Sequence, residues 1–350
     1  MYGTRHTAGM TEALLPAVAS LALQLQPVEG RPFARIDGPV PARAASPCEL
    51  VAMDAAGREL GRARVGAGEV NLAAALPAIR SAPRAVRVQA LRDGVPVDAP
   101  LVVTPLEVRP TIRTMTDLRP DGKTRFTRII GWGDRLLDPS NPAHAEAARG
   151  WEKSDPAPRS GFRVDLDRDV AFETTAGRIR FAMRPDAAPA TALNFVALAA
   201  SGFYDGTIVH RVVPKGRGGR PFVIQGGDPT GTGDGGPGYD IMLEPSDLPH
   251  DFGVVSMARN DWPDSAGSQW FVALTREETA RLDGQYCAFG EAVEGADAIL
   301  AIERGEIVDE STGRPRAPVT VTRATVQPAR PWVPGSGRPE PRVSRPGTTQ

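Results

Sequence analysis

The stretch from Val209 to Asp228 constrains the fold of this chain more than any other. It reads V-H-R-V-V-P-K-G-R-G-G-R-P-F-V-I-Q-G-G-D, with Arg211 between apolar residues and Phe222 beyond a glycine-rich loop. Gln225 follows that aromatic residue by three positions. β-Branched and aromatic residues bounded by glycine and proline are typical of short strands joined by turns. The stretch therefore predicts two strands and a loop that present a cation, an aromatic ring and an amide.

Composition narrows the class of protein. A length of 350 residues leaves room for two domains. The 37 glycines and 34 prolines follow no period, which predicts turn-rich β structure and open linkers. A net charge of −1 argues against nucleic acid as a partner. No apolar run approaches the roughly 20 residues of a membrane span. Cys48 and Cys287 lie far apart, so no disulfide is expected.

Residues 1–20 form an N-terminal extension that has two interpretations. Ala13–Leu25 is apolar and follows a basic residue, Arg5, as in a weak signal peptide. Apolar and polar residues alternate from Leu21 onward, which favours a half-buried strand. The compartment stays open, with the cytoplasm slightly favoured over export or the periplasm.

Residues 21–107 predict a small accessory domain made of β-strands. Arg84–Leu91 alternates polar and apolar residues, and Asp93-Gly94 is a strong signal for a two-residue hairpin turn before Val95–Val103. Regular spacing of strands and turns predicts a small Ig-like β-sandwich, although the Cys…Trp…Cys pattern of true Ig domains is absent. Residues 108–165 are expected to form a linker or an extension packed on the next domain.

Residues 166–327 predict a second domain of different pattern. Val170–Met183 alternates around a central Ala-Gly turn, which indicates a hairpin. Ala188–Gly202 predicts a helix, because a proline suits its first turn and a glycine its end. Residues 328–350 are rich in proline, glycine and arginine and are expected to be a disordered tail.

Three stretches of this second domain together resemble the cyclophilins, which are peptidyl-prolyl cis–trans isomerases. They are Val209–Asp228, Val255–Phe271 and Leu282–Gly290, and the glycine-rich loop that follows the first is similar to that of bacterial members. The resemblance covers roughly Leu166–Val326. It implies a mainly β fold, namely a closed eight-stranded antiparallel barrel capped by two helices, the second at Gly295–Arg304.

The resemblance also implies an activity and its residues. A cyclophilin isomerises Xaa–Pro bonds in peptides and unfolded proteins and assists folding, with no cofactor and no metal. Arg211 would polarise the twisting amide, and Gln225 would orient that arginine. The matching positions of the proline pocket are Phe222, Val223, Phe271, Leu282 and Tyr286, and those of the substrate-backbone face are Ala258, Arg259 and Gln269. A monomer is favoured.

Several positions depart from the family pattern and keep an alternative open. Lys215–Pro221 is a longer, basic connection, which either overhangs the groove and favours acidic peptides or is a mobile surface loop. Tyr286 stands where many members have histidine, Arg259 where many have asparagine, and Arg281 where drug-sensitive members have tryptophan. The alternative function is a catalytically weak peptide-binding or scaffold module whose N-terminal domain selects the partner.

Two histidines invite an acid–base interpretation that their positions do not support. His210 adjoins Arg211 on a predicted strand, where successive side chains face opposite sides, so it should point away from the groove. His250 lies in a predicted loop with no partner in the sequence pattern. His210 is expected to be structural.

Overall fold

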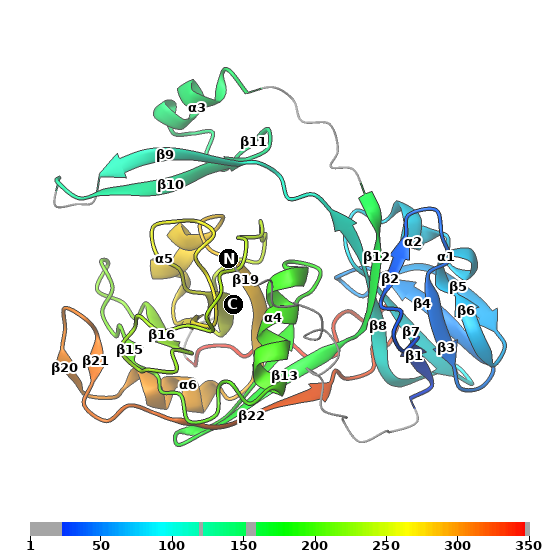
Figure 1. Cartoon of the computed structure of the whole chain (residues 1–350). Helices are drawn as coiled ribbons and strands as arrows, with labels where there is room; N and C mark the ends of the chain where they lie inside the picture. The colour runs from blue at the N-terminus through cyan, green and yellow to red at the C-terminus, as the bar shows by residue number, and fades with distance from the viewer. Residues whose placement is uncertain (1–22, 119–121, 152–158, 347–350) are drawn as a thin grey trace, which may run out of the picture.

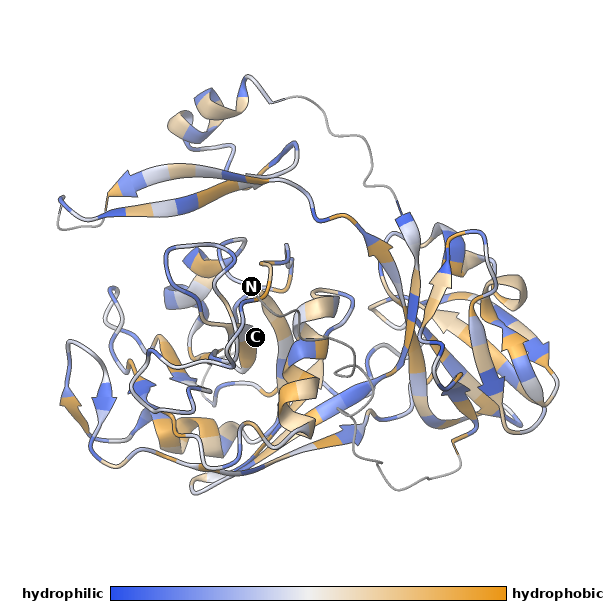
Figure 2. Cartoon of the chain, in the orientation of Figure 1, coloured by the Kyte–Doolittle hydropathy of each residue, from blue (hydrophilic) through white to orange (hydrophobic). Residues whose placement is uncertain are grey.

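Two β-rich lobes stand side by side in the computed structural model, which describes residues 23–118, 122–151 and 159–346 (Figure 1). A long hairpin reaches from the N-terminal lobe over the C-terminal lobe. Apolar residues recur along the strands of both lobes (Figure 2). The predicted fold class, mainly β, is confirmed. The signal-peptide interpretation of residues 1–20 lies outside the described residues.

The N-terminal lobe is a sandwich of two antiparallel sheets, with the orders β1-β3-β6 and β2-β12-β8-β7-β4-β5. Side chains of both sheets form one apolar core, and Leu50, Leu101 and Phe162 are fully buried in it. The elements are β1 (Leu25–Pro27), β2 (Phe33–Arg35), β3 (Pro41–Ala44), β4 (Cys48–Met53), β5 (Glu59–Val65), β6 (Gly68–Asn71), α1 (Leu72–Ala75), α2 (Ala78–Ser81), β7 (Val86–Arg92), β8 (Val95–Glu107) and β12 (Arg159–Leu166).

The hairpin predicted between β7 and β8 is confirmed. Asp93 and Gly94 have φ angles of 51° and 78°, the positive values that a two-residue turn of this kind requires. Both faces of β7 are nevertheless buried, because its polar residues Arg87 and Gln89 are as inaccessible to solvent as its apolar ones. Charged groups and the C-terminal segment cover that polar face.

The segment expected to be a linker contains a hairpin, a helix and the last strand of the first sheet. β12 pairs with β8 on one side and with β2 on the other, so residues 21–107 alone do not complete the N-terminal lobe. An unpaired β8 would leave a row of backbone groups exposed, and β12 covers them. The Ig-like character of the sandwich stays a prediction. The other elements are β9 (Ile112–Leu118), β10 (Arg125–Trp132), β11 (Arg135–Leu136) and α3 (Pro142–Ala148).

The C-terminal lobe is built on one curled antiparallel sheet of order β15-β16-β18-β17-β19-β14-β13-β22, with α4 and α6 packed on it. The predicted hairpin and both predicted helices are confirmed. The elements are β13 (Arg168–Thr174), β14 (Gly177–Met183), α4 (Pro189–Ala200), β15 (Arg211–Val212), β16 (Val223–Gly226), β17 (Val254–Met257), β18 (Trp270–Ala273), α5 (Arg276–Thr279), η1 (Ala280–Leu282), β19 (Ala288–Glu294), α6 (Ala296–Glu303), β20 (Ile307–Asp309), β21 (Arg314–Pro315) and β22 (Val321–Pro328).

Segments beside the two edge strands of this sheet meet each other. The Val209 N–H donates to the Val319 carbonyl at 2.8 Å, and the Val321 N–H donates to the Thr207 carbonyl at 2.8 Å. These bonds join the segment that precedes β15 to the start of β22 and the residues just before it, while the sheet ladder itself ends at β15 and β22. Closure into a full barrel stays a prediction.

The β9–β10 hairpin belongs to the C-terminal lobe by its contacts. Ile129 and Trp132 are part of the apolar core of that lobe. The Gln285 side chain accepts a hydrogen bond from the Ile129 N–H at 2.9 Å and donates one to the Ile129 carbonyl at 2.6 Å. Arg109 forms an ion pair with Asp264. The β9–β10 hairpin therefore packs on the C-terminal lobe, beside the loop that contains Tyr286.

The segment after β22 corrects the expectation of a disordered tail for its described part. Trp332 is buried, and its N–H donates to the Gln89 side chain at 2.8 Å. Val343 donates to the Ala292 carbonyl at 2.8 Å. Composition was misleading because the arginines of this segment find carboxylates on the lobes, as Arg345 does with Glu303 at 2.6 Å. The segment ties the two lobes together.

Candidate active site

Arg211 and Gln225 face each other across the β15–β16 pair. The Arg211 guanidinium donates to the Gln225 side-chain oxygen at 3.0 Å. The Gln225 amide in turn donates to the Gln269 side-chain oxygen at 3.0 Å, and Gln269 donates to the carbonyl oxygens of Gly233 and Gly235. This chain of hydrogen bonds holds the Arg211 guanidinium from one side, and among the described residues its other N–H groups have no side-chain partner.

Arg211 is a half-buried cation. No carboxylate forms an ion pair with it in the part of the chain that the structure describes. Burial lowers the pKa of its guanidinium from the ordinary value, with a small opposing effect of Tyr286. An arginine stays charged despite such a shift, so the site keeps a fixed positive charge with incomplete compensation.

An apolar pocket lies beside this cation. Val223, Phe271 and Leu282 form a small buried cluster, and Phe222 and Tyr286 pack at its rim. The rings of Phe271 and Tyr286 meet edge to face with centroids 5.6 Å apart. The packed rings give the groove an apolar patch directly beside the Arg211 cation.

The predicted site residues come together in two adjoining hollows. A groove of about 540 Å³ is lined by Arg211, Gln225, Ala258, Arg259 and all five residues of the predicted proline pocket. A second hollow of about 480 Å³ shares Gln225, Ala258 and Arg259 with the groove and adds Gln269 and the glycine-rich loop. All ten candidates therefore lie in one continuous surface, and their individual roles remain to be proposed.

Arg259 uses its side chain to support the pocket wall. Its guanidinium donates twice to the Gln285 carbonyl, at 3.2 and 2.9 Å, and its carbon lies 4.7 Å from the centroid of the Tyr286 ring. The arginine thus braces the tyrosine that departs from the family pattern. The two departures form one packed pair.

His250 corrects the expectation of an unpartnered loop residue. Its Nδ1 lies 2.9 Å from a carboxylate oxygen of Asp283, its Nε2 lies 3.0 Å from the Ser256 hydroxyl, and its ring stacks on Phe271 at 5.7 Å. It buttresses the floor of the pocket. No spacing in the sequence points to this role, because the partners come from three separate segments.

His210 does not line the groove, and it neighbours Gly233 of the glycine-rich loop. Burial lowers the pKa of its imidazole. A neutral, half-buried ring is consistent with the structural role expected from its place beside Arg211.

The inserted loop is anchored at the rim of the groove. Glu278, a buried residue of α5, accepts a hydrogen bond from the Arg220 N–H at 3.2 Å. A Cβ atom at Gly216 would lie 2.5 Å from the Glu278 carboxylate, so a larger residue would require this side chain to move. Lys215 and Arg217 line the groove as a result.

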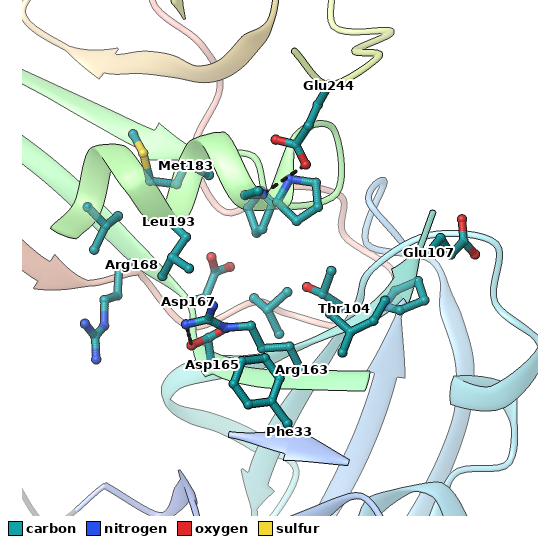
Figure 3. Close-up of a pocket in the computed structure, with 18 of the residues that line it drawn as sticks. Phe33, Thr104, Glu107, Arg163, Asp165, Asp167, Arg168, Met183, Leu193 and Glu244 are labelled. Carbon is teal, nitrogen blue, oxygen red and sulfur yellow. Dashed lines mark hydrogen bonds and ion pairs between the residues drawn. The ribbon is translucent and has the colours of Figure 1, made fainter. Parts of the chain in front are cut away.

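A separate cavity of about 360 Å³ lies between the lobes, where β8 and β12 face α4 (Figure 3). Its lining is largely apolar and includes Phe33 and Leu193. Two of its carboxylates already have structural partners: Glu244 accepts from the first N–H groups of α4, and Asp167 binds Arg87 at 2.6 Å. Both carboxylates thus have a structural role at the boundary between the lobes.

Known proteins resemble the C-terminal lobe. The model of the family "Cyclophilin type peptidyl-prolyl cis-trans isomerase/CLD" matches residues 169–326. Peptidyl-prolyl cis-trans isomerase ppi1 of Schizosaccharomyces pombe is 40% identical over 162 residues, which are 45% of this chain and 97% of that protein. Peptidyl-prolyl cis-trans isomerase B of Bacillus subtilis is 41% identical over 135 residues, 38% of this chain and 88% of that protein. A solved cyclophilin type isomerase of Cryptosporidium parvum is 30% identical, with a TM-score of 0.42, and covers 47% of this chain and 99% of that one.

The match spans nearly the whole length of these relatives, and the chain belongs to the cyclophilin-type peptidyl-prolyl cis-trans isomerase family. The resemblance inferred from the sequence is thus confirmed. The relatives include bacterial and fungal proteins, so the bacterial-type detail stays a prediction. The N-terminal lobe and the β9–β10 hairpin lie outside the matched residues.

Proposed function

We propose that the C-terminal lobe catalyses cis–trans isomerisation of Xaa–Pro bonds in peptides. The observation that carries this proposal is the position of Arg211, a fixed cation with no ion-pair partner among the described residues, beside an apolar pocket that we expect to hold a proline ring. The family membership of the chain supports the same activity, since the relatives are named peptidyl-prolyl cis-trans isomerases.

The chemistry requires only that the site bind a twisted amide better than a planar one. Amide resonance sets a rotation barrier of about 18–20 kcal/mol, and rotation localises the lone pair on the prolyl nitrogen. An N–H donor of Arg211 directed at that nitrogen stabilises the twisted state, and Gln225 keeps the guanidinium in place. The pocket holds the ring while the rest of the peptide turns. No covalent bond is made or broken, and the reaction needs no nucleophile.

The range of substrates follows from the same site. Prolyl bonds of unfolded chains exchange over tens to hundreds of seconds, so they are natural substrates for such a groove. We propose unfolded proteins as clients, a role in assisting folding, and a monomer as the active form. No helix among the described residues is long and apolar enough to cross a membrane.

A second candidate is a peptide-binding or scaffold module with weak catalysis. The observations that favour it are the inserted loop at the rim of the groove and Tyr286 on its wall. Against it, Arg211, Gln225 and the pocket are all in place, and Tyr286 packs on Phe271 without displacing it. The isomerase is therefore the better supported function.

The test is an isomerisation assay on a short Xaa–Pro peptide with wild type and Arg211→Ala. We expect the variant to lose at least about tenfold in kcat/KM, since one donor to a developing charge is removed. Its free energy of unfolding should fall by no more than about 1.5 kcal/mol. Arg304→Ala, at an exposed arginine after α6, is the matched control.

Two results would contradict the proposal in different ways. Full activity in a folded Arg211→Ala variant would remove the assigned role from this residue. No acceleration by folded wild type would favour the binding module.

A further inference from the structure

The groove is far more positive than the chain as a whole. Its lining contains five cationic side chains and one carboxylate, that of Glu310. The whole chain, by contrast, has 41 Lys and Arg against 42 Asp and Glu residues. The cations are Arg211, Lys215, Arg217, Arg259 and Arg281. A concentration of one charge sign in a concave surface attracts ligands of the opposite sign.

Four of these cations come from departures from the family pattern. Lys215 and Arg217 belong to the inserted loop, and Arg259 and Arg281 replace other residue types. Isomerisation as proposed requires only Arg211. Arg259 braces Tyr286 through hydrogen bonds to Gln285, whereas the guanidinium of Arg281 lies over the Phe222 ring and the side chains of Lys215 and Arg217 form no hydrogen bond among the described residues.

We call Lys215, Arg217 and Arg281 the cation wall. Within residues 23–118, 122–151 and 159–346, no carboxylate forms an ion pair with any of the three. Arg220 of the same loop does pair with Glu277. Burial lowers the pKa of Arg281, and the charge of Arg217 lowers it further, while Tyr286 and Glu278 oppose this shift without reversing it.

The cation wall is held in place by the fold. Glu278 fixes the inserted loop through the Arg220 N–H, and the Gly216 N–H donates to the Arg220 carbonyl at 2.6 Å. On the facing side, the guanidinium carbon of Arg281 lies 4.3 Å from the centroid of the Phe222 ring. Both sources of charge are therefore anchored at the edge of the proline pocket.

The cation wall lies at the end of the groove that is away from the second hollow. Gln269 and the glycine-rich loop line that hollow, and none of the three wall residues does. A peptide that places its proline between Phe222 and Phe271 therefore meets the cation wall on the side of the proline away from Gln269.

We propose that the cation wall selects substrates with an anionic residue close to the proline, either a carboxylate or a phosphorylated hydroxyl. This inference rests on the proposed isomerase function and names its substrate class. An anion at this place pairs with cations that are already positioned, so the gain appears as specificity for the substrate. The reacting amide still depends on Arg211.

The test compares matched peptides of five residues with a central proline in an alanine background. Glu, phosphoserine, Ala or Lys is placed one or two positions from the proline, on either side. Exchange between isomers is followed by NMR at low salt. We expect kcat/KM to be about fivefold higher for Glu than for Lys on one side of the proline, and the ratio to shrink as the salt concentration rises. The ratio of phosphoserine to Glu distinguishes a phosphate from a carboxylate site.

Variants assign the preference to the wall. In the triple variant Lys215→Gln/Arg217→Gln/Arg281→Gln, the ratio of Glu to Lys should fall to about one. Arg217→Gln alone changes one exposed side chain and should lower the ratio partly, which covers the case of a triple variant that does not fold. Arg220→Gln is the matched control, because Arg220 belongs to the same loop but binds Glu277 and does not line the groove.

Each outcome bears on one of the two proposals. Wild type that accelerates the alanine peptide but treats Glu and Lys alike overturns the inference and leaves the isomerase standing. Wild type that accelerates no peptide overturns the proposed function. A preference that survives in the folded triple variant also overturns the inference, since its origin would then lie elsewhere.

Discussion

Arginine has opposite surroundings in the groove and at the joint between the lobes. In the groove, Arg217 and Arg281 are exposed, and no carboxylate pairs with them in the described structure. At the joint, Arg87 and Arg184 are buried or nearly so, and each binds two carboxylates. The difference follows from desolvation. A cation left free at the surface costs little and can meet a changing ligand, whereas a cation inside the protein must be compensated by fixed partners.

The joint is the cluster of Arg87, Arg184, Asp167, Asp186 and Glu291. Arg87 donates to Asp167 at 2.6 Å and to Asp186 at 3.2 Å, and Arg184 donates to Asp186 and Glu291, both at 2.7 Å. Burial acts to raise the pKa of Asp186, but Arg87 and Arg184 outweigh it and hold that pKa well below its usual value. The cluster therefore connects β7 of the N-terminal lobe to the C-terminal lobe through two arginines, Arg87 and Arg184, that both stay charged.

The largest effect is expected from breaking the joint. Arg87→Met keeps much of the side-chain volume but leaves Asp167 and part of Asp186 buried without their cation. We expect the free energy of unfolding to fall by about 3–5 kcal/mol. Denaturant unfolding of the full chain measures this loss.

The matched control for this prediction is an exposed ion pair of the same lobe. Arg31 binds Glu69, and both side chains are more than half exposed. Arg31→Met should cost at most about 1 kcal/mol. Equal losses in the two variants would show that burial does not distinguish these arginines, and the comparison between joint and groove would fail.

The sequence predicted the groove much better than the joint. The residues of the groove lie in three contiguous motifs, and strand alternation places their side chains on known faces. Local patterns also predicted the Asp93-Gly94 turn and the first helix of the C-terminal lobe, because proline and glycine at helix ends act through neighbouring backbone. The second helix was predicted only through the family resemblance.

The joint is invisible to such patterns because its partners are far apart in the sequence. Arg87 and Asp186 are separated by 99 residues, and Trp332 donates to a residue 243 positions away. A proline- and arginine-rich composition therefore predicted disorder for a segment that tertiary contacts fix. β12 was missed for the same reason, because it pairs with β8 although the β9–β10 hairpin lies between the two strands in the sequence.

A smaller effect is expected from breaking the contact between the β9–β10 hairpin and the groove. It tests whether the first half of the chain influences substrate binding. Gln285 binds the Ile129 backbone of the hairpin through two hydrogen bonds and adjoins Tyr286. In Gln285→Ala, the loss of both bonds should lower the free energy of unfolding by about 2 kcal/mol. The packed pair of Arg259 and Tyr286 should become more mobile, and KM should rise about threefold with little change in kcat.

The control for the hairpin contact is Gln327→Ala on β22, where the glutamine accepts one long hydrogen bond from Arg178 at 3.3 Å. Its KM should equal that of wild type. A KM unchanged in Gln285→Ala as well would mean that the hairpin only tethers the lobes, and the groove would then be independent of the first half of the chain.

The smallest effect concerns Asp228, a buried carboxylate near the groove that is held by hydrogen bonds and forms no ion pair among the described residues. Burial acts to raise the pKa of Asp228, but hydrogen bonds from the Thr230 side chain and from backbone N–H groups of the glycine-rich loop outweigh it, and the pKa lies at about 2. Because this pKa is below the ordinary aspartate value of 3.8, the stabilisation is present above pH 3.8 and is lost as the pH falls toward 2. Asp228→Asn should lower the Tm by about 2–4 °C at pH 7. The two proteins should converge in thermal unfolding near pH 2. A difference that persists unchanged at that pH would mean that the side-chain shape, and not its charge, supports the loop behind Gln269.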